Sequence, residues 1–342
     1  MAADIEEQPA GYERLLSTTH AAAVAEVAAV IARRRPRHVV FTARGTSDHA
    51  ALYAAYLAEI RLGLPAGLAS PSAITVFGAR PDLSDALVVG VSQSGGSPDL
   101  AEVLRVARAS GALTLAVTNN PDSPLVETAE LSVDVAAGHE RAVAATKTYT
   151  AELLALLMLI EGVRAGDGVL PAPERAALDR LPELAARTLA DDTPAQLAPR
   201  YRFAAQLVTT GRGYAYPTAR EAALKLMETS YLPALAFSGA DLLHGPLAMT
   251  DPDVPVLAVV GSGPGGQSMR EVLPRLGERR ADVVVVGSAD VGQTRMAVPE
   301  VDERYAPLLD ILPLQRLALA LALTRGENPD APRGLKKVTA TM

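Results

Sequence analysis

Short apolar runs alternate with amphipathic segments along the first half of the chain. The runs that we expect to form strands are 38–42, 87–91 and 113–118, and the expected helices are 21–32, 48–62, 99–110 and 146–162. The strands are apolar on both faces, which is typical of a parallel sheet covered by helices on both sides. The pattern therefore predicts an α/β fold of three layers.

The second half repeats this plan. Its expected strands are 203–209, 254–260 and 282–286, and its expected helices are 217–232 and a segment ending at Arg279. The turn at 45–47 corresponds in position to 211–213, and the turn at 92–97 corresponds to 261–268. The chain is therefore interpreted as a duplicated α/β domain. Only the first copy keeps a run of hydroxyl side chains, so we expect one ligand site per chain.

Composition shifts suggest where the domains end. A Gly- and Pro-rich stretch at 165–173 is typical of a linker. We expect a first domain over 1–165, including an N-terminal helical segment, and a helical connection over 166–198. A second domain follows over 199–325, and a C-terminal tail over 326–342.

Composition also excludes several classes of function. The 342 residues carry a net charge of −7, which argues against a nucleic-acid partner. They contain no cysteine, so no disulfide, thiolate metal site or Cys nucleophile is expected. The five histidines show no metal-binding spacing, and we expect neither a metal nor a cofactor. The acidic start is not a signal peptide, and apolar runs such as 153–160 are too short to cross a bilayer, so we expect a cytoplasmic protein without membrane contact.

The turn at 92–97 is the strongest local signal of function. Its sequence, Ser-Gln-Ser-Gly-Gly-Ser, lies between a predicted strand and a predicted helix. Glycines allow close backbone approach, hydroxyls and N–H groups donate to anionic oxygens, and a helix N-terminus adds partial positive charge. The turn is therefore predicted to bind phosphate. A plain serine cap of the helix is the alternative interpretation.

Two further polar turns are expected at the same edge of the sheet. Thr46 and Ser47 follow the first strand, and 118–120 ends the third. Because ligands of open α/β sheets bind outside the carboxyl ends of the strands, we expect these turns to converge on the loop at 92–97.

Several motifs in this order resemble one known family. They are Gly45-Thr46-Ser47, Ser92-Gln93-Ser94-Gly95, Val143-Ala144-Ala145-Thr146-Lys147, Glu221 to Glu228, Leu243-His244-Gly245-Pro246-Leu247 and the tail 332–339. Together they resemble the isomerase half of glucosamine-6-phosphate synthase, a protein with tandem sugar-isomerase (SIS) domains. The resemblance implies two tandem SIS domains, each flavodoxin-like.

The resemblance also implies which residues bind the substrate, a small sugar phosphate. The residues implied to hold the phosphate or the sugar hydroxyls are Thr46, Ser47, Ser92, Gln93, Ser94 and Ser97, with the backbone of Val143 and Ala144 lining the sugar. Ala145 stands where the family has Ser, and Ser97 where it has Thr. Arg44 stands where the family has a small residue, and Arg141 precedes Ala142-Val143; either of the two could alter the pocket around C2 of the sugar.

Glu228 matches the family's carboxylate that moves a proton between C1 and C2. Lys225 lies one helical turn earlier on the same face, where it could stabilise an enolate oxygen, and Glu221 is an i,i+4 partner of Lys225. A solvated face of Glu/Lys pairs is the alternative interpretation.

Two further catalytic roles come from the resemblance alone. His244 matches the histidine that opens the sugar ring from the neighbouring subunit, which implies a homodimer. Lys337 matches the tail lysine that forms a Schiff base with a ketose. The tail after Lys337 is one residue shorter than the family's tail, so Lys336 is the alternative candidate for this role.

The reaction remains a choice among several. The family's glutaminase uses a Cys nucleophile, and we expect this cysteine-free chain not to draw ammonia from glutamine by that route. The first hypothesis is an enzyme of amino-sugar metabolism that deaminates and isomerises glucosamine 6-phosphate to fructose 6-phosphate. The alternatives are a dehydratase or lyase acting on N-acetylglucosamine 6-phosphate by elimination at C3, a fructosamine-6-phosphate deglycase, and a non-catalytic sugar-phosphate sensor.

Overall fold

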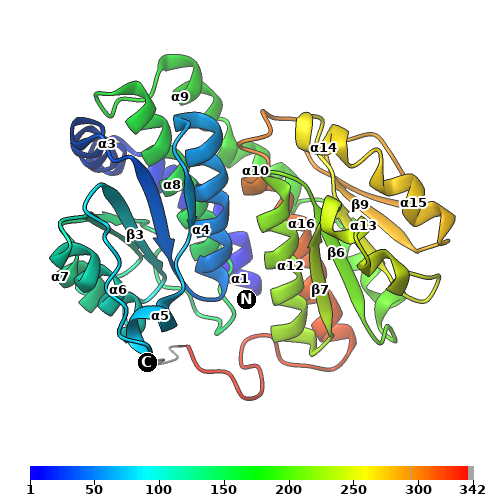
Figure 1. The fold of residues 1–342 in the computed structure, drawn as a ribbon. Coiled ribbons are helices and arrows are strands. Elements are labelled where there is room, and N and C mark those ends of the chain that lie inside the picture. Colours follow the sequence, from blue (N-terminus) through cyan, green and yellow to red (C-terminus); the bar gives the residue numbers. More distant parts are fainter. Residues whose placement is uncertain (293, 338–342) are drawn as a thin grey trace. The chain divides into compact units, whose positions relative to one another are not determined.

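The computed structural model describes residues 1–292 and 294–337, which form two compact units (Figure 1). The N-terminal unit contains Ala10–Glu140, Lys147–Arg180 and the described residues after Leu335. The C-terminal unit contains Leu181–Leu335, together with Met1–Pro9 and Arg141–Thr146. Neither unit is continuous along the chain, and each is described by itself below.

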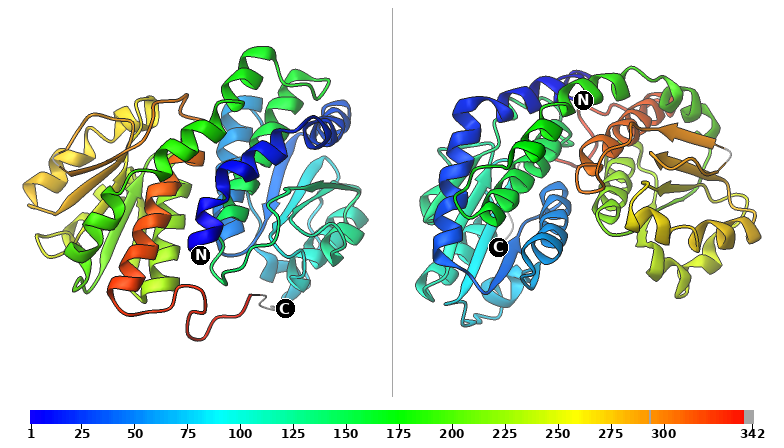
Figure 2. Two further views of the ribbon diagram at one scale, coloured as in Figure 1. Left: turned by 180° about the vertical axis from the view of Figure 1, so that it is seen from behind. Right: turned by 90° about the horizontal axis from the view of Figure 1, so that it is seen from above.

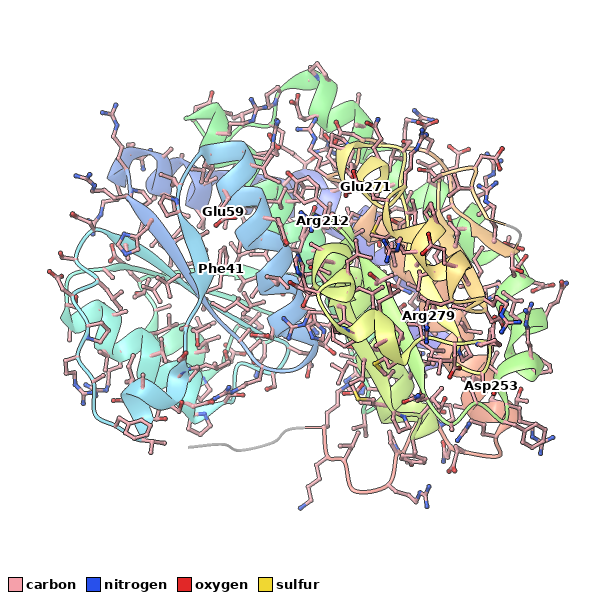
Figure 3. The ribbon with its side chains drawn as sticks, turned by 45° about the vertical axis from the view of Figure 1, so that its right-hand side comes forward. Phe41, Glu59, Arg212, Asp253, Glu271 and Arg279 are labelled. Carbon is pink, nitrogen blue, oxygen red and sulfur yellow. The ribbon has the colours of Figure 1, made fainter. Side chains whose placement is uncertain are left out.

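The N-terminal unit is built on a five-stranded sheet with the order β2-β1-β3-β4-β5, and all neighbouring strands are parallel. The strands are β1 His38–Thr42, β2 Ala66–Leu68, β3 Ala86–Ser92, β4 Leu113–Thr118 and β5 Leu131–Asp134. Every residue of β3 and β4 is buried, as expected for strands covered on both faces. Phe41 of β1, labelled in Figure 3, is 2% exposed.

Helices cover both faces of this sheet. On one face, α5 Pro71–Thr75, α6 Pro98–Ala109 and α7 Pro124–Thr128 bury a core that includes Leu100, Leu104 and Leu125. The other helices are α2 Gln8–Leu16, α3 Thr18–Arg34, α4 Thr46–Leu57 with the π-helical turn η1 Ala58–Leu62, α8 Lys147–Ala165 and α9 Ala172–Leu178. Of these, α3, α4 and α8 pack together on the opposite face (Figure 2). The unit therefore has the predicted three layers.

The C-terminal unit repeats the topology. Its strands are β6 Leu207–Gly211, β7 Ala234–Ser238, β8 Val256–Val259, β9 Val283–Gly287 and β10 Thr294–Ala297. They lie in the order β7-β6-β8-β9-β10, again parallel throughout. In both sheets the strand order, counted from the first strand of the unit, is 2-1-3-4-5. The shared order confirms the predicted tandem α/β fold and makes β6 the counterpart of β1, and β8 that of β3.

The helices of this unit also form two layers. They are α1 Ala2–Glu6, α10 Leu181–Leu189, α11 Thr193–Leu197, η2 Ala198–Tyr201, α12 Ala215–Ser230, α13 Gly239–Leu243, η3 Pro246–Met249, α14 Pro264–Ser268, α15 Val272–Glu278 and α16 Pro307–Thr324. On one face, Leu242 of α13 and Leu276 of α15 pack against the buried strands. On the other, α12 and α16 run side by side (Figure 2, left), and α10 and α11 pack on α16.

Helix α16 corrects one expectation from the sequence. Among the described residues it is the single helix that is long and apolar enough by itself to cross a membrane. The consecutive helices α2 and α3 pass the same test together, with a bend of 63° between them. Because 72% of the α16 stretch is buried inside the structure, packing in the core accounts for its apolar character.

One predicted strand is misplaced. The segment 203–209 was expected to be a strand, but β6 begins only at Leu207, and Phe203 is 87% exposed. The preceding residues form the short helix η2, and the guanidinium of Arg202 stacks 5.3 Å from the centre of the Phe203 ring. Short strands such as β2 and β10 lack a clear apolar run and were not predicted.

Candidate functional site

The serine-rich loop of the N-terminal unit lies between β3 and α6 and is held by its own backbone. The Ser92 hydroxyl accepts a hydrogen bond from the Gly95 N–H at 3.2 Å, and the Ser94 hydroxyl accepts one from the Gly96 N–H at 3.2 Å. Each serine oxygen thus accepts within the loop, and neither O–H donates to another described residue. The loop therefore presents O–H donors to a ligand.

Two other side chains of this loop are also available. Neither the Gln93 amide nor the Ser97 hydroxyl makes a hydrogen bond to another described residue, and Ser97 does not cap α6 with its side chain. The alternative interpretation, in which a serine side chain caps the helix, is therefore wrong for Ser97. These donors lie at the N-terminal end of a 12-residue helix, where the helix dipole favours an anion.

The turn after β4 donates hydrogen bonds to the backbone of this loop. The Asn120 amide donates to the Ser94 carbonyl at 3.2 Å, and the Asn119 N–H donates to the Gln93 carbonyl at 3.3 Å. The expected convergence of these two turns is confirmed by these contacts. Gly95 has a φ of +62°, and a Cβ at this position would overlap the Ser123 side chain. Only glycine fits there without strain.

The turn after β1 carries the other predicted phosphate ligands. Gly45, with a φ of +56°, precedes Thr46 at the start of α4. The Ser47 hydroxyl donates to a carboxylate oxygen of Glu152 at 2.8 Å, and Glu152 on α8 is fully buried. Ser47 therefore keeps only its oxygen lone pairs for a ligand. Glu152 was not predicted, because a Glu within an apolar helix has no local sequence signal.

The corresponding loop of the C-terminal unit is occupied by a side chain of the chain itself. The two carboxylate oxygens of Glu303 accept hydrogen bonds from the N–H groups of Gly265 and Gly266, at 3.1 and 3.0 Å. A Cβ at Gly263 or Gly265 would collide with Glu303. Arg212, labelled in Figure 3, belongs to the turn after β6 in the same unit. This carboxylate stands where the first copy offers room for an anion.

Helix α12 brings together three of the predicted catalytic residues. Lys225 Nζ lies 3.3 Å from Glu221 Oε1 and forms a second ion pair with Glu228 Oε2. The side chains of Glu221 and Lys225 are fully buried, whereas that of Glu228 is 21% exposed. The array is therefore not a solvated helix face, because its cation is covered and only one carboxylate reaches the surface.

The charge state of Lys225 follows from these contacts. Burial by itself lowers the pKa of a lysine, but the charges of Glu221 and Glu228 and their hydrogen bonds outweigh it and raise the pKa of Lys225 above its ordinary value. The side chain is thus a fixed ammonium at neutral pH.

The predicted sugar-lining residues Val143 and Ala144 belong to the C-terminal unit. The Val143 N–H donates to the carbonyl of Asp330 at 3.4 Å. Just before them, the carboxylate of the fully buried Asp4 accepts hydrogen bonds from the N–H groups of Arg141 and Ala142, at 3.0 to 3.2 Å. Asp4 was not predicted, since its partners lie more than 130 residues away.

His244 and the tail lysines lie outside helix α12. His244 ends α13 with an exposed side chain, and it makes no hydrogen bond or ion pair with Glu221, Lys225 or Glu228 among the described residues. Lys336 is exposed and Lys337 is half-buried. The rest of the tail motif, 338–339, lies outside the described residues.

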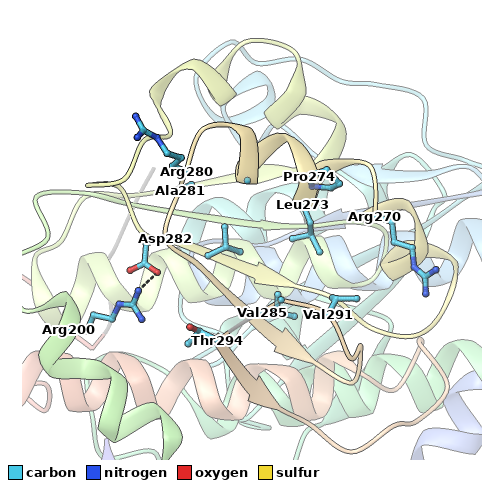
Figure 4. A pocket seen from close by; sticks show the side chains of 13 residues that line it. Arg200, Arg270, Leu273, Pro274, Arg280, Ala281, Asp282, Val285, Val291 and Thr294 are labelled. Atoms are coloured by element: carbon cyan, nitrogen blue, oxygen red, sulfur yellow. Dashed lines mark hydrogen bonds and ion pairs between the residues drawn. The ribbon is translucent and has the colours of Figure 1, made fainter.

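A separate cavity of about 660 Å³ in the C-terminal unit contains none of these residues (Figure 4). Leu273, Val285 and Val291 form its apolar wall, and Arg200 pairs with Asp282 at one end, at 2.6 Å.

Comparison with known proteins places these features in one family. The chain matches the SIS domain twice, over residues 34–162 and 201–325. The chain therefore belongs to the SIS-domain proteins, and each of its two sheets belongs to one SIS domain.

Individual relatives agree with this assignment. The chain is 37% identical over 309 residues to glutamine–fructose-6-phosphate aminotransferase (isomerizing) of Methanothermobacter thermautotrophicus, covering 87% of this chain and 51% of that protein. It thus spans about half the length of the curated relatives it matches, and it is homologous to their isomerase half.

Solved structures extend the similarity to nearly the whole chain. A candidate phosphosugar isomerase from Silicibacter pomeroyi is 35% identical, with a TM-score of 0.85 and coverage of 96% of this chain and 98% of that one. The C-terminal domain of glucosamine-fructose-6-phosphate aminotransferase from Francisella tularensis is 27% identical, with a TM-score of 0.84 and coverage of 96% and 97%.

Proposed function

We propose that this chain is an enzyme that deaminates and isomerises glucosamine 6-phosphate to fructose 6-phosphate. The observation that carries the proposal is Glu228, a partly exposed carboxylate held against a fully buried ammonium. An aminotransferase named for fructose 6-phosphate is 37% identical to the chain, which supports this class of substrate. The serine-rich loop supplies the donors for the 6-phosphate.

The proposed reaction needs one base and water. Once the sugar ring is open, Glu228 takes the proton from C2, the C1–C2 double bond forms, and the C1 carbonyl oxygen takes a proton from water, which the C2 nitrogen gives back when the imine forms. Glu228 then returns its proton to C1, which leaves an imine at C2. Water adds to the imine and ammonia leaves, so that fructose 6-phosphate remains. General-base help of this kind contributes about 10²- to 10⁴-fold to the rate.

Lys225 is proposed as a positioning residue for Glu228. Its ammonium is fully buried and its hydrogen bonds go to two carboxylates. It therefore acts on the substrate through Glu228, by holding that carboxylate in place and in its charged form.

The same proton transfer serves both directions of the reaction. With no ammonia supplied, mass action favours ammonia release, so deamination is the direction to assay. The test is incubation with glucosamine 6-phosphate, following ammonia and fructose 6-phosphate. We expect turnover by the unmodified chain, none by Glu228→Gln, and retained turnover by Glu278→Gln, an exposed glutamate of the same unit. Ammonia release by Glu228→Gln at the unmodified rate would overturn the proposal.

Other substrates separate the alternatives. An ultraviolet-absorbing unsaturated product from N-acetylglucosamine 6-phosphate, without ammonia, would replace the deaminase with a dehydratase. Turnover of fructosamine 6-phosphate alone would indicate a deglycase. Binding of all three sugar phosphates without turnover would indicate a sensor.

We also propose that the enzyme is a homodimer in which His244 serves the neighbouring subunit. Its exposed position at the end of α13 supports this role. Mixing inactive His244→Ala and Glu228→Gln subunits should then restore about a quarter of the activity, because mixed dimers contain one intact site. No recovery after exchange of subunits would contradict it.

The tail lysine is proposed to form a Schiff base with fructose 6-phosphate, with loss of water. Reduction with borohydride should attach the sugar phosphate covalently, which mass spectrometry detects. The adduct should persist in Lys336→Arg and disappear in Lys337→Arg, and the reverse result would assign the role to Lys336.

A further inference from the structure

An arginine outside the serine-rich loop reaches the first turn of helix α6. Arg44 lies in the turn after β1, and its Nε and Nη2 atoms lie 2.8 and 2.7 Å from Asp99 Oδ2. Asp99 is 1% exposed, whereas the Arg44 side chain is 50% exposed. The pair therefore links the two turns that carry the predicted phosphate ligands.

The charge of Asp99 needs compensation if the loop is to bind an anion. Asp99 is the second residue of α6, two positions after Ser97, and its other carboxylate oxygen accepts the Leu100 N–H at 3.0 Å. A buried carboxylate at this position opposes a phosphate dianion. Residues 92–100 contain no Lys or Arg of their own.

Within the part of the chain that the structure describes, Asp99 is the one side-chain partner of Arg44, which leaves its remaining donors available. A guanidinium has five N–H groups, and the contacts with Asp99 use two of them. Two other cations of the same unit have partners: Arg105 pairs with Glu102 on the exposed side of α6, and Lys147 donates to the His139 carbonyl at 2.7 Å.

We propose that Arg44 binds the phosphate of the substrate directly, while Asp99 orients its guanidinium over the serine-rich loop. This inference rests on the proposed sugar-phosphate function and names a further binding residue of that site. Its ligand is a phosphate monoester dianion, which a planar guanidinium recognises through paired N–H groups.

The test measures binding separately from turnover. Calorimetry with fructose 6-phosphate, and competition by inorganic phosphate, compare the unmodified chain with Arg44→Gln, Asp99→Asn and the double variant. Arg105→Gln is the matched control, because it removes the same charge from an exposed residue of α6. We expect Arg44→Gln to weaken binding by about tenfold or more, as for loss of a charge-assisted hydrogen bond, and Arg105→Gln to change it less than about twofold.

The double variant distinguishes direct contact from simple neutralisation of Asp99. If Arg44 touches the phosphate, Arg44→Gln combined with Asp99→Asn stays weak, although the uncompensated carboxylate is gone. Full recovery of affinity in the double variant overturns the proposal, and so does unchanged affinity in a folded Arg44→Gln. If Arg44→Gln fails to fold, Arg44→Lys replaces it in the test, because it keeps the positive charge and removes the guanidinium. Phosphate binding by Arg44→Lys equal to that of the unmodified chain then contradicts a guanidinium contact.

These outcomes are independent of the reaction. Arg44-dependent phosphate binding without ammonia release would sink the deaminase and leave this inference standing. Ammonia release with Arg44-independent binding would do the opposite.

Discussion

The hydroxyl of Tyr231 accepts a hydrogen bond of 2.6 Å from the backbone N–H of Arg333, and the Arg333 guanidinium lies 4.2 Å from the centre of the same ring. Tyr231 directly follows α12, the helix that carries Glu228, and ends it in the left-handed conformation with a φ of +50°. One residue thus terminates this helix and holds the tail at Arg333.

Replacing Tyr231 by Phe removes the acceptor and keeps the ring. We expect the tail to detach more often, at a cost of about 1 kcal/mol for the lost hydrogen bond. Limited trypsin digestion after Arg333 measures this, and the Phe variant should be cut several-fold faster than the unmodified chain. Equal cleavage rates would show that the ring contact alone holds the tail.

The buried lysine of α12 should dominate the stability of that helix. Lys225→Met leaves the buried carboxylate of Glu221 without its cation, which we expect to cost about 3–5 kcal/mol in the free energy of unfolding. Adding Glu221→Gln should recover part of that loss, as measured by urea denaturation. An additive double variant would mean that the two residues do not interact.

The same ion pairs predict a pH dependence. The pKa of Lys225 is raised in the folded protein, so its stabilising contribution is complete below the unfolded value of about 10.4 and is lost as pH rises through the higher folded value. The difference in unfolding free energy between the unmodified chain and Lys225→Met should therefore be constant from about pH 7 to 9.5 and shrink above about pH 10.5. A difference that shrinks already near pH 8 would contradict the raised pKa.

Asp310 predicts a pH dependence of the same sign, in which stability is lost as the pH rises. Burial, and then the negative charge of Glu303, raise the pKa of this carboxyl well above its ordinary value. An acid with a raised folded pKa stabilises the protein at pH values below its unfolded pKa, and this contribution is lost as pH rises through the folded pKa. Asp310→Asn should therefore be more stable than the unmodified chain at pH 8, with a smaller advantage near pH 4. An advantage that grows on acidification would be inconsistent with this assignment.

Gly95 tests the geometry of the serine-rich loop. Gly95→Ala combines a φ of +62° with a clash against Ser123, and we expect a strain of about 1–3 kcal/mol and clearly weaker binding of inorganic phosphate. Gly67→Ala in the same unit is the control, because no atom lies within 4 Å of its Cβ position. Thermal unfolding should show a lower melting temperature for Gly95→Ala than for Gly67→Ala, and calorimetry should show weaker phosphate binding. Equal stability and equal phosphate affinity of the two variants would contradict the strained geometry of Gly95.

Local patterns in the sequence determined most of the fold. The predicted strand 38–42 and the predicted strand 113–118 coincide with β1 and β4, because strands that helices cover on both faces are mostly apolar. The duplication was also visible, since both copies keep glycine-containing turns at the carboxyl ends of equivalent strands. The helical spacing of Glu221, Lys225 and Glu228 placed the three on one face of α12.

Only the tertiary structure decided which polar groups form hydrogen bonds within the chain and which can still bind a ligand. Glu152 accepts the hydrogen bond of the Ser47 hydroxyl, Glu303 fills the loop of the second copy, and Asp99 pairs with Arg44, although the partners are separated by 37 to 105 residues. The same is true of α12, where burial makes Lys225 a covered cation and leaves Glu228 at the surface. Sequence spacing reports neighbours on one helix or strand, whereas desolvation and hydrogen-bond partners depend on what the folded chain packs against them.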